Sequence, residues 1–388
     1  LLEKHTFKEL LADVEQRNLQ NNIVGLEASR LFARSEINMG VDAFRDSLYA
    51  MLKRNTFLNI KFENMLDTLG EMSRTDLYSY LKEWEQLTPL PFYSIGEPEL
   101  TKVVNKGGEE FFVLKVLVSN NSDYDGIIQM NVLQNGWWYQ PMEDPRARKK
   151  VEIAAHTSKE FVSVWEEQIR DVEINTMVSG NLPYMIRQSI GNVKQERNKI
   201  VKDTIYTLPE SSLEMPGEVI VDNEDSTLFV LSTPAVVGLL PKWLDKVEDT
   251  SFKYSGISWW RAPLQWTATT NAKYYGKYIR SAYVIKSGDG SQTATWKIPV
   301  PEAGQYELYY HVFKDDELRW NDRLQGEYHF RVAYDSEMED AYINLRKANE
   351  GWEQLGTYYF SADTVRVVLT DECKLRSVTA DAVKIVKR

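Results

Sequence analysis

The chain has 388 residues, of which 43% are hydrophobic and 27% are charged, and its 20 Gly and 13 Pro are not in excess. Because such a composition supports packed cores, it excludes a chain that is disordered throughout, and the length predicts two or three domains. The formal net charge of −11, with Lys and Arg scattered along the chain, lacks the basic field that neutralises phosphates, so we predict no nucleic-acid partner.

The first 95 residues carry the periodicity of amphipathic helices. Apolar side chains recur three or four residues apart, which places them on one face of a helix. The sets are Phe44, Leu48, Met51 and Leu52; Phe62, Met65, Leu66 and Leu69; and Leu77, Tyr80, Leu81 and Trp84. Ser73 and Asp76 resemble a capping box, which predicts a helix start there. Pro89 and Pro91 end the helical segment, because proline lacks the amide donor.

Strand patterns replace helical ones from about residue 96 to residue 190 and predict a small β-sandwich. The predicted strands are Phe111–Val118, Ile127–Leu133 and Phe161–Trp165, and a turn at Asn120–Asp123 separates the first two. Residues 191–217 are charged and polar and contain two prolines, which predicts a linker.

Residues 218–388 are rich in short strands separated by turn signals, which predicts a jelly-roll-like β-sandwich. Alternate residues share one face of a strand. The predicted buried sets are Tyr306, Leu308, Tyr310 and Val312, and Val365, Val367 and Leu369. The expected fold class is therefore α+β and mostly β, with a helical bundle segment at 1–95 followed by the two sandwiches.

The sequence contains no catalytic constellation. Its four histidines, His5, His156, His311 and His329, never fall at the spacing of H-E-x-x-H, and neither a G-x-S-x-G elbow nor a Walker loop is present. The single cysteine, Cys373, can form neither an internal disulfide nor a CxxC pair. We therefore predict no catalytic residue, no enzyme activity and no cofactor for this chain.

One acidic turn is a weak candidate for a cation site. Asp222, Asn223 and Asp225 supply the oxygen atoms that a structural calcium requires. Clustered carboxylates are more often a solvated loop, and that interpretation is favoured here.

Aromatic residues crowd together between residues 259 and 278. Exposed rings stack on the C–H faces of sugars, which makes Trp259, Trp260, Trp266 and Tyr275 candidate ligand-binding residues. The alternative is that these rings fill the sandwich core or cover its edge, since aromatic residues are common in strands.

The segment Leu19–Pro91 resembles the end of the catalytic domain of gluzincins, the thermolysin-like zinc aminopeptidases. The resemblance rests on Phe44-x3-Leu48-x3-Leu52 and on Met72–Trp84, in which Arg74 replaces the usual glycine. It implies that a β domain follows at 96–190. The zinc ligands and catalytic residues of that family lie upstream of this tail, so none is carried over to any residue here.

Residues 218–388 resemble the golvesin C-terminal-like domain, which is also found attached to xanthan lyases. The segments that carry this resemblance are Glu218–Asp225, Pro301–Tyr309, Gly351–Phe360 and Thr379–Ile385, whereas 228–253 looks inserted. The resemblance implies a β-sandwich on secreted or surface proteins, with carbohydrate binding suspected and no catalytic residues.

The chain contains no apolar run of about 18 residues, so no membrane span is expected. No signal peptide is visible and the chain starts at Leu1, so we interpret it as a fragment with a catalytic or membrane domain upstream. The expected function is a non-catalytic, extracytoplasmic binding or spacer region with a glycan or cell-envelope partner. Two alternatives stay open, structural support or assembly of an upstream domain, and a parent protein that is an active zinc aminopeptidase.

Overall fold

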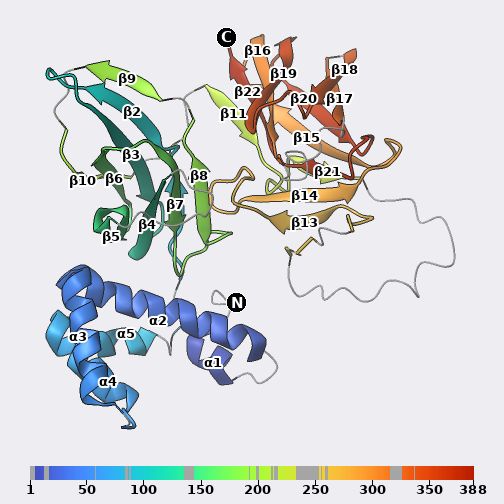
Figure 1. The fold of residues 1–388 in the computed structure, drawn as a ribbon. Coiled ribbons are helices and arrows are strands. Elements are labelled where there is room, and N and C mark those ends of the chain that lie inside the picture. Colours follow the sequence, from blue (N-terminus) through green and yellow to red (C-terminus); the bar gives the residue numbers. More distant parts are fainter. Residues whose placement is uncertain are drawn as a thin grey trace. The chain divides into compact units, whose positions relative to one another are not determined.

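A computed structural model describes most of the chain. The described residues are 5–12, 17–56, 58–83, 86, 89–134, 144–191, 193–197, 201–210, 213, 217–232, 253–254, 256–257, 261–314, 326–335 and 337–388. The chain divides into two compact units, Leu1–Leu213 and Glu214–Arg388 (Figure 1). Over the described residues of the whole chain strands outweigh helices, which confirms the mostly β fold class.

Five helices open the first unit and are drawn in blue in Figure 1. They are α1 (Phe7–Ala12), α2 (Arg17–Met39), α3 (Val41–Arg54), α4 (Phe62–Ser73) and α5 (Leu77–Glu83). None of these described helices is both long enough and apolar enough to cross a membrane. The predicted stripes supply most of their shared core, which buries Leu31, Phe44, Met51, Leu66, Leu69 and Leu77. Among the stripe residues whose side chains the structure describes, Leu52 is 52% exposed and Phe62 is 43% exposed, which differs from the prediction. Trp84 of the last stripe lies outside the described residues.

The junction between α4 and α5 corrects the predicted helix start at Ser73. Ser73 is the last residue of α4, and its hydroxyl donates to the carbonyl of Leu69 at 2.7 Å. The cap of α5 is Asp76, whose Oδ1 accepts the backbone N–H groups of Tyr78 at 3.1 Å and Ser79 at 3.2 Å. Arg74 ends α4 with a left-handed backbone, φ 54° and ψ 35°, which is the conformation that glycine adopts most readily.

The first sandwich is built from a six-stranded and a four-stranded sheet. The six-stranded sheet has the order β10-β6-β3-β2-β9, with β1 paired to β3, and the four-stranded sheet has the order β5-β4-β7-β8. The strands are β1 (Tyr93–Ile95), β2 (Glu99–Val104), β3 (Glu110–Asn120), β4 (Gly126–Gln134), β5 (Arg148–Ile153), β6 (Thr157–Trp165), β7 (Ile169–Asn175), β8 (Met185–Ser189), β9 (Lys194–Arg197) and β10 (Thr204–Pro209). The three predicted strands lie within β3, β4 and β6.

The core of this sandwich draws side chains from both sheets. Val116 and Phe161 come from the six-stranded sheet, and Ile128 and Ile174 come from the four-stranded sheet. Helix α2 lies against the second of these sheets, because Ala33 is buried with Ile127 in one cluster. The helices and the first sandwich therefore belong to one compact unit, although the sequence assigned them to separate domains.

The predicted linker at 191–217 contains two strands of the first sandwich. Strand β10 pairs antiparallel with β6, and β9 pairs parallel with β2. Both are edge strands whose side chains are largely exposed. A strand held mainly by backbone hydrogen bonds needs no apolar alternation, so the polar sequence of β9 carried no strand signal. Strand β10 does contain Ile205 and Tyr206, residue types that favour strands, and they stay exposed here.

The second unit contains two larger sheets and a three-stranded sheet. Their orders are β11-β22-β16-β19, β12-β15-β20-β17-β18 and β13-β14-β21. The strands are β11 (Glu218–Val221), β12 (Phe229–Leu231), β13 (Thr267–Thr270), β14 (Ser281–Lys286), β15 (Thr293–Pro299), β16 (Gly304–Val312), β17 (Glu327–Tyr334), β18 (Glu337–Asn344), β19 (Gly351–Phe360), β20 (Thr364–Thr370), β21 (Ser377–Ala380) and β22 (Val383–Lys387).

The two larger sheets of the second unit share one core. Alternate residues of β16 and β20 point into it, which confirms both predicted buried sets. Trp296 of β15 lies fully buried between them and contacts Tyr310 of β16 and Phe229 of β12. The segment 228–253, predicted to be inserted, therefore begins with a core strand, because β12 pairs with β15.

Substitution of Arg74 by glycine is expected to stabilise the helical segment. An L-residue in the left-handed region costs on the order of 1 kcal/mol, and glycine relieves this strain. Urea denaturation followed by helical circular dichroism should show a higher midpoint at an unchanged slope. Arg45→Gly, in the exposed middle of α3, should lower the midpoint, because glycine costs roughly 1 kcal/mol within a helix. A lower midpoint for Arg74→Gly would contradict the conclusion that the left-handed backbone of Arg74 is strained.

Candidate functional site

The sequence predicted four ligand-binding aromatic residues, and the structure distinguishes them. Trp259 and Trp260 lie outside the described residues. Trp266 packs against the core of the second unit, and its buried indole N–H has no hydrogen-bond partner among the described residues. Tyr275, in the connection between β13 and β14, joins a group of rings on the side of β16 that faces away from the core.

Tyr275 meets His311 and Trp352 in this group. The ring centroid of Tyr275 lies 5.1 Å from that of Trp352 and 5.8 Å from that of His311. His311 and Trp352 are direct partners across β16 and β19, and their rings meet edge to face at 5.1 Å. Because Tyr310 and Val312 of β16 point into the core, His311 between them points to the opposite face of the sheet.

Lys384 of β22 extends the group along the same face. Its Nζ lies 4.8 Å from the ring centroid of Trp352 and 5.4 Å from that of Tyr309, which is within cation–π distance. Nζ also donates to Glu218 at 2.9 Å, and the side chains of this ion pair are only 13% and 14% exposed. The aromatic face is defined here as Tyr275, Tyr309, His311, Trp352 and Lys384.

Asp381, which lies between β21 and β22, holds two residues of the aromatic face in position. This residue is fully buried, and its Oδ2 lies 2.8 Å from Nδ1 of His311. Its two carboxyl oxygens accept the backbone N–H of Tyr275 at 3.1 and 3.2 Å. Burial raises the pKa of Asp381, and the nearby His311 opposes that increase. The same carboxyl group therefore positions the His311 ring and the loop that carries Tyr275.

A polar edge borders the aromatic face. Glu307 accepts the hydroxyl of Tyr309 at 2.6 Å and the guanidinium of Arg388 at 2.8 Å. The Tyr309 hydroxyl, and then Arg388, lower the pKa of Glu307, so its carboxylate stays charged. Partly exposed rings can stack on the apolar face of a ligand, and the fixed hydrogen-bonding groups beside them can bond the hydroxyl groups of the same ligand.

Comparison with known families supports the sequence resemblance for this region. Residues 259–387, which contain the whole aromatic face, match the golvesin C-terminal domain. The C-terminal part of the chain is golvesin-like. The resemblance of Leu19–Pro91 to gluzincins stays a prediction, because no comparison bears on it.

Three of the solved structures that resemble the chain illustrate how weak the likeness is. A Paenibacillus xanthan lyase is 16% identical at a TM-score of 0.31, and the alignment covers 78% of this chain but only 27% of the lyase. Bacteroides uniformis β-glucuronidase 2, bound to cyclophellitol-6-carboxylate aziridine, is 11% identical at 0.22, covering 82% of this chain and 32% of the enzyme. The exo-β-1,3-galactanase of Phanerochaete chrysosporium is 7% identical at 0.27, covering 74% and 68%.

The chain spans about a quarter of the xanthan lyase and about a third of the glucuronidase. No curated protein matches the sequence.

The acidic turn predicted as a cation site is closed by its own hydrogen bonds. Asp225 Oδ2 accepts the backbone N–H of Asp222 at 2.9 Å, and the Asn223 amide bonds the Ser281 hydroxyl at 2.7 Å. Burial raises the pKa of Asp222 well above its usual range, which disfavours the charged form that calcium requires. Within the described ranges no three His, Cys, Asp or Glu side chains are grouped to hold a metal. A structural calcium stays a prediction that this geometry does not support.

Most of the aromatic face was missed from the sequence. Tyr309 and His311 occupy the outward positions of the strand whose inward residues were recognised, so strand alternation offered a signal for them. Asp381 and Lys384 fall within the Thr379–Ile385 segment that carried the golvesin resemblance. Trp352 falls within the Gly351–Phe360 segment of the same resemblance, but its place beside His311 depends on pairing between β16 and β19.

The substitution Asp381→Asn is expected to destabilise the golvesin-like domain by about 1–3 kcal/mol. Asparagine replaces one of the two carboxyl oxygens with an NH2 donor, which would face the backbone N–H of Tyr275 or the ring of His311 and lose the charge-assisted bond to His311. Hydrogen exchange of β16 and β22 measures the change in local unfolding free energy. Asp363→Asn, at an exposed position, is the matched control and should leave the exchange unchanged. Equal exchange in the two variants would contradict the organising role of Asp381.

Proposed function

We propose that the golvesin-like domain is a non-catalytic, carbohydrate-associated module that binds glycan through the aromatic face. The observation that carries the proposal is the ring group of Tyr275, Tyr309 and Trp352, held by Lys384 and Asp381 on the outward side of one sheet. Rings on a rigid sheet offer a preformed surface, so little conformational entropy is lost on binding. The sugar rings stack on the aromatic side chains and the polar edge bonds their hydroxyl groups.

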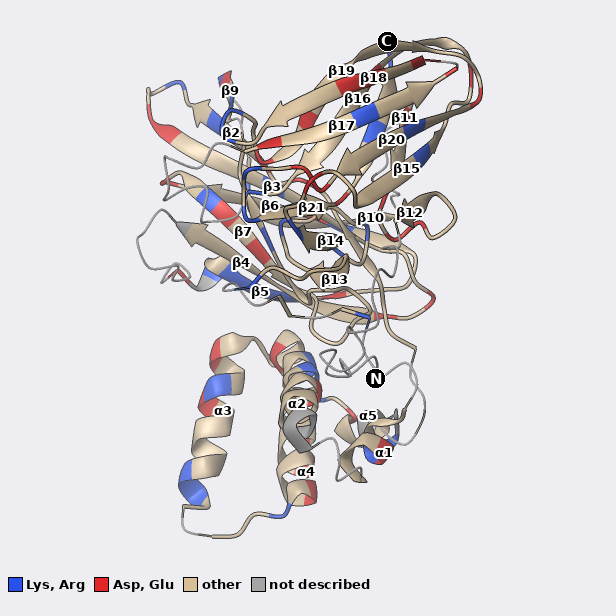
Figure 2. Cartoon of the chain, turned by 90° about the vertical axis from the view of Figure 1, so that its right-hand side faces the viewer, with Lys and Arg blue, Asp and Glu red and all other residues tan. Residues whose placement is uncertain are grey.

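The charges around the face favour an uncharged glycan. Lys384 is paired with Glu218, and Arg388 is paired with Glu307, so each cation beside the rings has a carboxylate partner. An acidic sugar would have to compete with these carboxylates for the same cations. Figure 2 shows charges of both signs interspersed along the strands. Stacking and neutral hydrogen bonds therefore dominate recognition.

The same proposal places the chain outside the cytoplasm, as a binding or spacer region of a larger protein with a catalytic or membrane domain upstream. The golvesin-like match supports this context. A parent protein with a zinc aminopeptidase domain is the finer form of the hypothesis and rests on the resemblance of Leu19–Pro91.

An alternative function is structural support or assembly of that upstream domain. The observation that favours it is that Trp266 packs against the core, and that the rings of the aromatic face are half-buried rather than fully exposed. Under this alternative the rings cover the edge of the sandwich and bind no sugar.

Replacement of Trp352 or Tyr275 by alanine is expected to weaken glycan binding roughly tenfold or more, because buried aromatic anchors dominate binding energy. A glycan array first identifies the ligand, and calorimetry then measures its affinity for each variant. Tyr342→Ala, on the exposed side of β18 in the other large sheet, is the matched control and should bind normally. Absence of binding by the unmodified chain, or equal loss in all three variants, would favour the structural alternative.

Glycan affinity is expected to change little between about 50 mM and about 500 mM salt, because screening weakens only interactions between exposed charges. The comparison should include a neutral polysaccharide and its uronic-acid counterpart in the same titration series. Tighter binding of the acidic polymer, lost at high salt, would contradict the assignment to uncharged glycans.

A further inference from the structure

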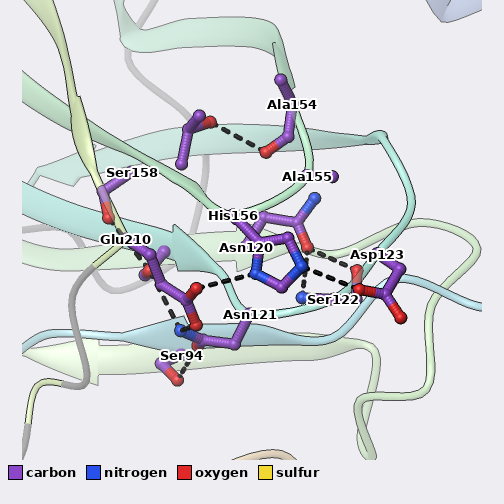
Figure 3. Close-up of polar contacts among 12 residues, drawn as sticks. Ser94, Asn120, Asn121, Ser122, Asp123, Ala154, Ala155, His156, Ser158 and Glu210 are labelled. Carbon is purple, nitrogen blue, oxygen red and sulfur yellow. Dashed lines mark hydrogen bonds and ion pairs between the residues drawn. The ribbon is translucent and has the colours of Figure 1, made fainter.

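His156 of the first unit joins three separate elements through two carboxylates. It lies in the turn between β5 and β6, and its Nε2 is 2.8 Å from Oδ1 of Asp123 in the turn between β3 and β4. Its Nδ1 is 2.7 Å from Oε2 of Glu210, the residue that follows β10. Figure 3 shows the imidazole ring between the two carboxylates. These three residues are called the histidine clasp.

The surroundings of the ring hold the clasp in place. His156 has a left-handed backbone, φ 52°, and the N–H of Ala155 before it donates to Asp125 Oδ1 at 2.8 Å. Asn121 donates to the second oxygen of Glu210, Oε1, at 2.8 Å, and is itself bonded by Ser94 (Figure 3). Both oxygens of Glu210 therefore bond groups outside β10.

The clasp requires both ring nitrogens to donate. A neutral imidazole has one donor and one acceptor, whereas the imidazolium has two donors. The hydrogen bond to Asp123, followed by that to Glu210, raises the pKa of His156 above its ordinary value of 6.5. Two other charged groups lie nearby. Asp125 bonds Ala155, and Lys159 of β6 donates its Nζ to Thr207 of β10 at 2.7 Å.

We propose that the histidine clasp is a pH-sensitive anchor for the end of β10, closed when His156 is protonated and opened at one carboxylate when the proton leaves. Glu210 directly follows edge strand β10 and lies three residues before the end of the first unit at Leu213. Opening at Glu210 removes one of the hydrogen bonds that hold the segment through which the chain leaves the first sandwich, while the bond from Asn121 stays. The proposal is independent of glycan binding.

The direction of the pH effect follows from linkage. Because the folded protein binds the His156 proton more tightly than the unfolded chain does, the clasp stabilises the fold fully below the ordinary pKa of 6.5. This stabilisation is lost as pH rises through the raised pKa. The loss is confined to the elements that the clasp joins, with β10 most affected because it is an edge strand.

The test measures hydrogen exchange of β10 amides in the full chain from about pH 5.5 to about pH 8.5, corrected for intrinsic exchange rates. In the unmodified protein, the protection factor of the β10 amides should fall as pH rises across this range. The size of the fall should equal the ratio of the acid dissociation constants of His156 in the unfolded and the folded protein. In His156→Asn, protection should be low and independent of pH. Asparagine is chosen because it tolerates a left-handed backbone. His329→Asn is the matched control, since His329 also contacts two carboxylates, Asp340 and Glu372, but lies in the second unit.

A parallel NMR titration of His156 keeps the test independent of variant folding. The unmodified protein should give a His156 pKa above 6.5, and Asp123→Asn and Glu210→Gln should each lower it. A His156 pKa at or below 6.5 would overturn the proposal. So would β10 protection with the same pH dependence in the unmodified protein and in His156→Asn.

Discussion

The buried carboxyl group of Asp381 is the constraint on which the golvesin-like domain depends. Burying a carboxyl group is costly unless the fold supplies hydrogen bonds, and this fold supplies them from Tyr275 and His311. The backbone carbonyl of the same residue accepts the indole N–H of Trp296, the largest fully buried ring of this core, at 3.2 Å. One residue thus joins the core, the sheet and the loop of the aromatic face.

Strand alternation divides the same strand between stability and recognition. The inward residues of β16 form the core, while Tyr309 and His311 point to the other side. Substitutions on the outward side can change ligand contacts while the core is retained. In the proposed function the outward rings bind glycan, and for that they need only a flat, rigid support.

Charged side chains hold the end of an edge strand in the first unit, whereas aromatic side chains cover the outward side of a sheet in the second unit. Its edge strand β10 has few buried side chains, so backbone pairing with β6 and the hydrogen bonds of Glu210 hold its end. Ion pairs between exposed groups contribute little to stability on average. Their effect here is local, since His156 connects turns that are distant in sequence, and this locality suits a switch better than a structural bond.

The sequence by itself determined the class of the fold, the golvesin resemblance and the buried faces of β16 and β20, because a period of two residues is a local property of a strand. It also predicted Tyr275 as a candidate ligand-binding residue, and the structure places this residue beside His311 and Trp352. Tertiary structure alone decided that 194–197 is a strand rather than linker, that 204–209 pairs with β6, that Asp76 rather than Ser73 caps α5, and that Trp266 packs against the core. Trp352 and Lys384 meet because β19 and β22 both pair with β16, and Tyr275 joins them because Asp381 accepts its backbone N–H. Contacts between residues so far apart depend on strand pairing and register, which no local pattern specifies.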